Sequence, residues 1–263
     1  MNKNIPVQLL NIIIGLFSEC YSCVKWEGFF SSMFNVTFGV RQGSVLSPIL
    51  FAIYIDNVST LSTPLYGKFV FVYADDIILL SPSLTELEKL LHACEKELEW
   101  LDMSINLKKS CCLRIGPRHD SKCANVISLS GCILPWVSEL RYLGIHIVSS
   151  RQFKISLQAA KRHFYRAANS IFGKIGRIAS EEVIIQMIQT KCIPVLLYGL
   201  EACPVATSDL RSLDFVINRF FMKLFLTSDI NVVKDCQEYF CVSLPSCLIE
   251  KRTERFLTKA NQS

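Results

Sequence analysis

Long hydrophobic runs are missing from this 263-residue sequence. The longest, Leu9–Phe17 and Phe69–Leu80, are short or broken by charge, and fall below the roughly 18 apolar residues that indicate a membrane span. Charged residues are also few, at 19%, whereas apolar residues make up 51%. Because disorder requires low hydrophobicity and high net charge, this composition excludes a disordered chain. The length suits one large domain or two small ones with a sizeable core.

The sequence also lacks a cysteine pattern typical of disulfides or zinc. Its twelve cysteines are scattered, and only Cys20 and Cys23 have C-x2-C spacing, with no second pair of ligands to complete a structural zinc site. No small-residue cleavage site follows the apolar N-terminal run, so we predict no secretory signal. We therefore expect reduced thiols in an intracellular protein, in the nucleus or the cytoplasm.

Charge is divided unevenly along the chain. Residues 1–105 carry 6 basic and 11 acidic side chains, a net charge of −5, whereas residues 106–263 carry 22 and 12, a net charge of +10. A basic half suggests a polyanionic partner, and nucleic acid is the commonest one. A solvated helical surface is the alternative explanation.

Hydrophobic periodicity predicts helices and strands in alternation, with a change to basic helices near residue 150. We expect buried helices over 5–24 and 49–58, the latter capped by Ser47 with Pro48 in its first turn, and a helix over 84–101 capped by Ser83 with Glu86 in a capping box. We expect strands over 34–38, 69–73, 77–80, 111–115 and 140–147. Beyond residue 150 we expect helices over about 153–175, 181–191 and 208–226.

The strands 69–73 and 77–80 predict a tight hairpin with two adjacent carboxylates, Asp75 and Asp76, at its tip. Like charges this close repel, and apolar flanks reduce their solvation. A divalent cation would relieve both costs, because Mg²⁺ takes oxygen ligands and completes its shell with water and substrate phosphates. The simpler alternative is a turn, since Asp is a favoured turn residue.

The order of five motifs favours the metal site. Together they resemble the reverse transcriptase of non-LTR (LINE-type) retrotransposons over roughly residues 1–225. The motifs are Gly39-Val-Arg-Gln-Gly-Ser-Val-Leu-Ser-Pro48, Phe51-Ala-Ile-Tyr-Ile-Asp56, Tyr73-Ala-Asp-Asp76, Asn106-Leu-Lys-Lys-Ser110 and Tyr142-Leu-Gly144. Further on, Ile193-Pro-Val-Leu-Leu-Tyr-Gly-Leu-Glu201 resembles a segment common downstream of this polymerase core.

This resemblance implies an α+β fold. Residues 1–150 would form a partial right-hand polymerase palm, an antiparallel sheet with helices, and residues 151–263 a basic, helical, thumb-like and C-terminal region. The implied activity is RNA-directed DNA synthesis by two-metal nucleotidyl transfer, with an RNA template and a DNA primer as partners and no membrane.

The resemblance also assigns roles to residues. Asp75 would be a metal ligand for Mg²⁺, with Asp76 supporting the same site, and Lys109 would assist the departing pyrophosphate. The remaining roles are a nucleotide and template pocket (Arg41, Gln42, Gly43, Tyr73, Ala74) and a primer grip (Tyr142, Leu143, Gly144).

One departure from the family pattern limits the expected activity. The family has a further essential aspartate upstream of the Gly39–Pro48 loop, yet no Asp occurs here before Asp56. We therefore expect an N-terminally truncated polymerase that lacks its fingers and first catalytic strand, is inactive alone and pairs with the missing part. A non-catalytic nucleic-acid-binding remnant is the alternative. A membrane- or partner-binding protein, suggested by the mean hydropathy of +0.33, is less favoured, because a palm without fingers would itself expose apolar surface.

Overall fold

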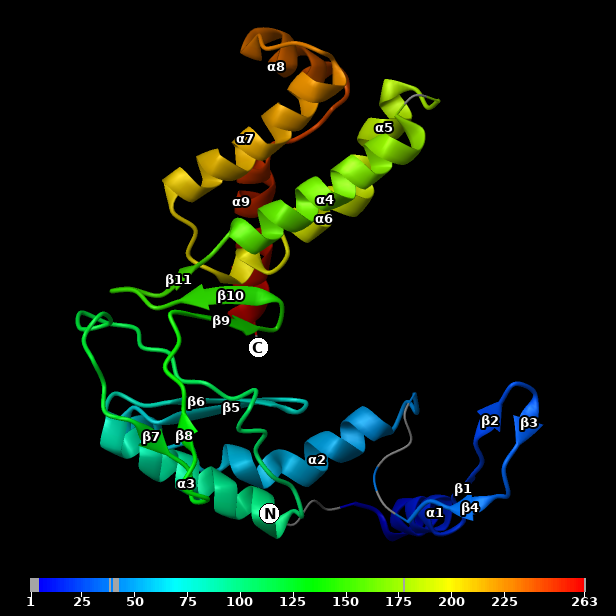
Figure 1. Ribbon diagram of the computed structural model, residues 1–263, viewed down its shortest axis with the longest axis vertical. Coiled ribbons are helices and arrows are strands. Elements are labelled where there is room, and N and C mark those ends of the chain that lie inside the picture. Colours follow the sequence, from blue (N-terminus) through cyan, green and yellow to red (C-terminus); the bar gives the residue numbers. More distant parts are fainter. Residues whose placement is uncertain (1–4, 38, 40–42, 177, 263) are drawn as a thin grey trace. The chain divides into compact units, whose positions relative to one another are not determined.

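The computed structural model describes residues 5–37, 39, 43–176 and 178–262 as an α+β fold (Figure 1). The chain divides into two compact units, Met1–Ile105 and Asn106–Ser263. The boundary between the two packed units, after Ile105, lies earlier in the chain than the change in composition near residue 150. The assignment of residues 1–150 to a palm and of residues 151–263 to a thumb-like region stays a prediction. Within the described ranges, no helix combines the length and apolarity that crossing a membrane requires.

The helices and strands are labelled in Figure 1. The α-helices are α1 (Val7–Ser18), α2 (Ser47–Ser59), α3 (Leu84–Trp100), α4 (Gln158–Ile175), α5 (Glu181–Met187), α6 (Ile193–Leu196), α7 (Thr207–Leu224), α8 (Ile230–Tyr239) and α9 (Pro245–Ala260). The strands are β1 (Tyr21–Ser22), β2 (Lys25–Trp26), β3 (Phe29–Phe30), β4 (Phe34–Asn35), β5 (Phe69–Tyr73), β6 (Asp76–Leu80), β7 (Val126–Ile127), β8 (Ile133–Leu134), β9 (Glu139–Tyr142), β10 (Ile145–Val148) and β11 (Lys154–Ile155). Short 3-10 turns cover Pro64–Tyr66 and Leu200–Ala202.

The core of the first unit lies between the β5–β6 hairpin and helices α2 and α3. The strands alternate, so Val70 and Val72 pack inward whereas Phe71 and Tyr73 face outward. Buried apolar side chains from all three elements form this core: Ile55, Val58, Val70, Leu90, Cys94, Leu98 and Leu101.

Helix α3 begins as its sequence predicts. The Ser83 hydroxyl accepts a hydrogen bond from the Glu86 backbone N–H at 3.2 Å, which satisfies one unpaired donor of the first turn. The Glu86 carboxylate does not complete a capping box. It pairs instead with Lys68 Nζ at 3.0 Å and Lys89 Nζ at 2.8 Å, and the first pair ties α3 to the start of β5.

Two burial predictions for the first unit are wrong. Helix α1 has no buried residue, and it ends at Ser18 rather than near residue 24. In α2 only Ser47, Ile55 and Val58 are buried, and Leu46 rather than Ser47 occupies the N-cap position. Apolar periodicity predicts that a helix forms, but burial also needs an element to cover it, and the described part of this unit covers only one side of α2.

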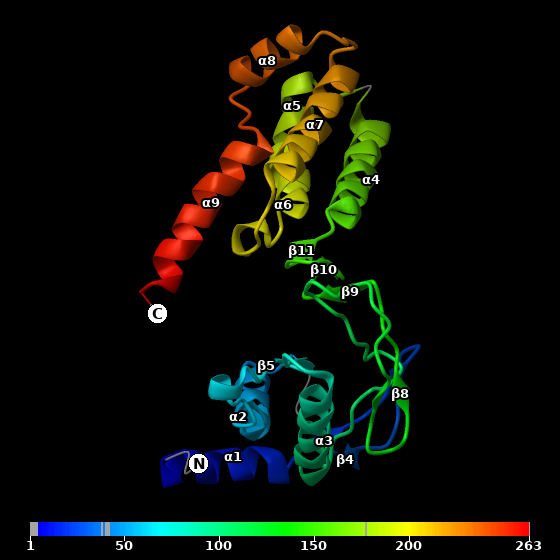
Figure 2. The same ribbon diagram turned by 90° about the vertical axis from the view of Figure 1, so that its left-hand side faces the viewer.

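The second unit packs a small antiparallel sheet against a helical bundle. The sheet has the strand order β11-β10-β9, and α4, α6 and α7 lie side by side beyond it (Figures 1 and 2). Ile155, in β11, and Leu157, just before α4, belong to the same hydrophobic core as the helices of the bundle. In that core Phe164, Leu213 and Ile217 are fully buried. Helix α9 packs against α7 at its N-terminal end, where the Ser246 backbone N–H donates to Asp214 Oδ1 at 2.9 Å.

Two predicted strands of this unit differ in the structure. The region 140–147 is not one strand but the β9–β10 hairpin, since Leu143 (φ +45°) and Gly144 (φ +85°) form a tight turn. Two consecutive positive φ values are typical of the hairpin turns that match strand twist. Residues 111–115 form no strand, and only Cys112 makes an isolated bridge, to Trp136.

The helix predicted over 181–191 continues to Leu196 through a π-helical segment, Ile188–Cys192. Pro194 lies just beyond this segment. A proline inside a helix lacks the N–H for an intrahelical bond and crowds the carbonyl four residues earlier. The wider π turn accommodates that carbonyl and lets the helix continue.

Candidate functional site

The two adjacent carboxylates lie at the tip of the β5–β6 hairpin, as predicted. Tyr73 pairs with Asp76 across the strands, so Ala74 and Asp75 alone form the turn. Asp75 and Asp76 are both exposed. Asp76 shares the outward face of its partner Tyr73, whose exposed fraction is 61%. The turn therefore presents both carboxylates to solvent at the end of an otherwise apolar hairpin.

Ala74 is held in an unfavourable backbone conformation at this tip. Its φ is +49°, the left-handed region, which costs an L-residue roughly 1–2 kcal/mol. Such strain persists where the surrounding structure enforces it, and it is common at functional sites. Here the pairing of β5 with β6 enforces it and fixes where Asp75 projects.

The donor chemistry of the tip fits part of a magnesium site. Mg²⁺ is commonly held by one or two carboxylates, with water and phosphate oxygens completing its shell. No group of three or more His, Cys, Asp or Glu side chains that could hold a metal occurs among residues 5–37, 39, 43–176 and 178–262. Asp75 and Asp76 can thus supply one or two ligands and leave room for substrate oxygens.

The other predicted residues of the first unit are only partly described. Arg41 and Gln42 lie outside the described residues. Gly43 has φ +83° with no neighbouring atom within 4 Å of the position a Cβ would take. Only glycine adopts this conformation routinely, so the backbone there turns sharply just before α2.

Lys109 lies in the second unit, in the turn predicted over residues 106–110. The Lys109 backbone N–H donates to the Asn106 carbonyl at 3.0 Å, and the Ser110 N–H donates to the same oxygen. The Lys109 side chain is exposed. The predicted turn is confirmed, and the role of Lys109 stays a prediction.

The predicted primer grip forms the β9–β10 turn and its approach. Tyr142 pairs with Ile145, which leaves Leu143 and Gly144 as the two turn residues. Beside them His146 Nδ1 lies 2.7 Å from Glu139 Oε1 across the two strands. This turn is the rim of a groove of about 600 Å³ whose other side is formed by Pro194, Val195 and Tyr198.

The sequence did not predict that this turn packs closely against residues 198–199, just after α6, in a mutual contact that we call the interlock. A Cβ on Gly144 would lie 3.0 Å from Tyr198 Cε1, and a Cβ on Gly199 would lie 2.6 Å from Ile145 Cδ1. Each glycine therefore accepts a side chain from the opposite segment. The sequence offered one indication of this contact, the Ile193–Glu201 motif. That motif resembles the family pattern, but no role was assigned to it.

Comparison with known proteins identifies the class. Residues 6–147, more than half of the chain, match the family model described as Reverse transcriptase (RNA-dependent DNA polymerase). The chain therefore belongs to the reverse transcriptase family, which confirms the resemblance carried by the ordered motifs. Members of this family generally use a divalent metal ion such as Mg²⁺ and bind an RNA template and a primer.

The similar curated proteins come from retrotransposable elements. The chain is 25% identical over 226 residues to the RNA-directed DNA polymerase from mobile element jockey of Drosophila melanogaster, covering 76% of this chain and 23% of that protein. It is 25% identical over 224 residues to the Pol polyprotein from type-2 element R2DM of the same species, covering 78% and 20%. It is 27% identical over 223 residues to the Pol polyprotein from type-1 element R2 of Popillia japonica, covering 79% and 30%. The chain thus spans less than a third of each relative.

Proposed function

We propose that this chain is the palm and thumb portion of an RNA-directed DNA polymerase of a retrotransposon. The observation that carries the proposal is the hairpin tip, where a strained two-residue turn presents Asp75 and Asp76 to solvent. Family membership over residues 6–147 supports it.

In this proposal Asp75 holds a Mg²⁺ ion and Asp76 supports the same site. When bound, the metal would activate the primer hydroxyl and stabilise the leaving group during phosphoryl transfer. Gly43, with Arg41 and Gln42, lines the pocket for the nucleotide and template base. The exposed ammonium of Lys109 assists the departing pyrophosphate.

The second unit supplies the grip on the template–primer duplex. Helix α4 carries Lys161, Arg162, Arg166 and Lys174 and no acidic residue. Cations on a helix that lacks carboxylates favour sequence-independent contact with phosphates. The Tyr142–Gly144 turn, fixed against Tyr198, would support the primer end.

Metal titration tests the site at the hairpin tip. Mn²⁺ binding is followed by electron paramagnetic resonance in the presence of an RNA–DNA template–primer. We expect Asp75→Asn to weaken Mn²⁺ binding about tenfold, because it removes a charged oxygen ligand. The matched control is Asp102→Asn, an exposed aspartate of the same unit whose left-handed backbone asparagine also tolerates. Equal Mn²⁺ affinity in Asp75→Asn and the unmodified chain would contradict the proposed metal site.

A second candidate function is nucleic-acid binding without catalysis, which the cations of α4 favour by themselves. Both candidates predict salt-dependent affinity for an RNA–DNA hybrid in filter binding, and its absence would refute both. Primer extension separates them. Mg²⁺-dependent synthesis that Asp75→Asn abolishes supports the polymerase and corrects the expectation of an inactive chain, whereas no synthesis and no Asp75-dependent metal binding favour the non-catalytic role.

A further inference from the structure

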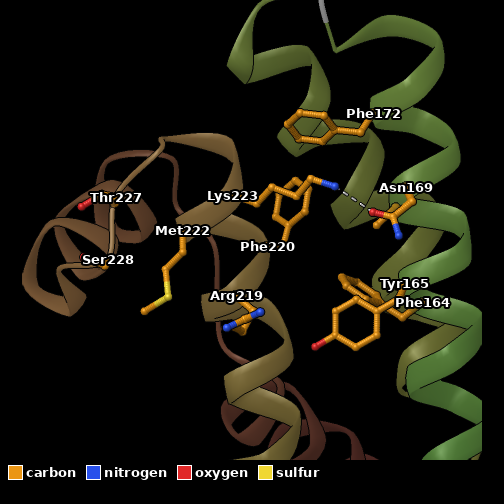
Figure 3. A pocket seen from close by; sticks show the side chains of 11 residues that line it. Phe164, Tyr165, Asn169, Phe172, Arg219, Phe220, Met222, Lys223, Thr227 and Ser228 are labelled. Carbon is orange, nitrogen blue, oxygen red and sulfur yellow. Dashed lines mark hydrogen bonds between the residues drawn. The ribbon is translucent and has the colours of Figure 1, made fainter.

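A second groove lies between α4 and α7 on the helical bundle, apart from the β9–β10 turn. Its volume is about 470 Å³, within the roughly 300–1,000 Å³ typical of small-ligand sites. Figure 3 shows Tyr165 and Phe172 projecting from α4, with Arg219 and Lys223 projecting from α7 across from them.

The lining of this groove combines aromatic rings with cations. It includes two basic side chains and no acidic one. On α7 the nearest carboxylate along the chain is Asp214, which accepts the Ser246 backbone N–H. Asp229, just beyond the groove, accepts the Asn231 backbone N–H as the cap of α8. Both carboxylates keep their charge but neither lines the groove, so the two cations that do line it favour an anion there.

The side chains of the groove are held in place before any ligand binds. Lys223 Nζ donates to Asn169 Oδ1 at 2.9 Å and lies 5.0 Å from the centre of the Phe172 ring. Tyr165 packs edge-on against the fully buried Phe164, with ring centroids 5.8 Å apart, yet remains 38% exposed. A ring that is fixed and exposed offers a stacking surface at little entropic cost.

We infer that the α4–α7 groove binds single-stranded RNA, with a base on Tyr165 and backbone phosphates on Arg219 and Lys223. Stacking on an aromatic ring requires an unpaired base, because the base faces of a duplex are covered by their neighbours. The hydroxyls of Thr227 and Ser228 and the amide of Asn169 line the same groove and can bond a ribose 2′-hydroxyl. The groove is therefore a site for unpaired RNA, separate from the duplex contacts proposed above.

Fluorescence anisotropy with a labelled oligouridylate tests this inference, since that RNA forms no duplex. We expect Tyr165→Leu to weaken RNA binding about tenfold and Tyr165→Phe to retain it, because phenylalanine keeps the stacking ring. Lys223→Gln should weaken binding and lower the salt slope by about 0.7, the value for one phosphate contact on a single strand. The matched control is Lys251→Gln, an exposed cation of α9 that does not line the groove.

Two further probes make the test specific. Affinity for an RNA–DNA hybrid should be unchanged by Tyr165→Leu, and oligodeoxythymidylate should bind more weakly than oligouridylate. Equal loss of hybrid and single-strand binding in Tyr165→Leu would overturn the assignment, as would equal affinity for the two single strands. Neither result depends on Asp75. The experiments can therefore refute the proposed metal site and support the RNA-binding groove, or refute the groove and support the metal site.

Discussion

Replacing Gly199 by alanine should destabilise the second unit by about 2 kcal/mol. Gly199 has φ +70°, and a Cβ there would lie 2.6 Å from Ile145 Cδ1. The left-handed backbone costs alanine roughly 1–2 kcal/mol. Forcing Ile145 from its rotamer adds about 1 kcal/mol, and the stiffer unfolded chain returns about 0.4–1 kcal/mol.

Gly131 provides the matched control for this prediction. It also has positive φ, +79°, but no atom lies within 4 Å of the position of its Cβ. Gly131→Ala should therefore lower the free energy of unfolding by the cost of the left-handed backbone alone. That loss is about 1 kcal/mol once the reduced entropy of the unfolded chain is included. The difference between the two variants measures the overlap with Ile145.

A double variant isolates the contact. Ile145→Val removes Cδ1, the overlapping atom, and alone should cost about 1 kcal/mol. Combined with Gly199→Ala, it should cost about 1 kcal/mol less than the sum of the single changes. The assay is urea unfolding followed by far-ultraviolet circular dichroism, in which the helices of the second unit supply much of the signal. Additivity within about 0.5 kcal/mol, or an equal cost for Gly131→Ala and Gly199→Ala, would refute the interlock.

Three further predictions concern the hairpin, an ion pair and the thiols. Ala74→Gly should raise the urea midpoint by the equivalent of about 0.5–1 kcal/mol, because relief of left-handed strain exceeds the flexibility that glycine adds; an unchanged or lower midpoint would contradict that strain. The hydrogen bonds from Lys89 and Lys68 lower the pKa of Glu86 below its ordinary value of 4.5. Its ion pairs therefore stabilise the fold above about pH 4.5 and are lost as pH falls through the lowered pKa. Acid titration should show a shallower loss of stability in Glu86→Gln than in the unmodified chain, and parallel curves would count against it. Burial raises the pKa of Cys112 to about 11. Iodoacetamide at pH 8 should therefore label the exposed Cys247 well before Cys112, as mass spectrometry of digests would reveal, and similar rates would show that Cys112 is accessible.

The sequence predicted the parts of the fold that depend on local pattern. The β5–β6 hairpin was predicted from two short runs of β-branched, aromatic and other apolar residues, and the Ser83 cap from a hydroxyl three residues before a glutamate. Both are confirmed. The β9–β10 turn was missed, because it needs Leu143 in the left-handed region and leucine carries no signal for that conformation. Helices α8 and α9 were missed as well, since much of their surface is polar and their apolar stripe is narrow.

The candidate site divides in the same way. The two apolar runs that flank Asp75 and Asp76 predicted their position at a hairpin tip, which is a local property of the chain. The interlock of Gly144 with Tyr198 joins segments far apart in sequence, so only the packed structure shows it. The burial of α1 was mispredicted for a related reason, because periodicity identifies an apolar helix but not whether a neighbour covers it.

The π-helical segment Ile188–Cys192 also sets the rotational phase of the residues on its C-terminal side. Each residue of an α-helix advances the chain by about 100° around the helix axis. Deleting one residue from this segment would restore a regular helix and turn Tyr198 and Gly199 by about that angle, away from Ile145 and Gly144. Substitutions test the individual contacts of the interlock. The number of residues between Ser180 and Tyr198 determines whether Tyr198 and Gly199 face Gly144 and Ile145 at all. Length in this stretch should therefore tolerate change less than composition does.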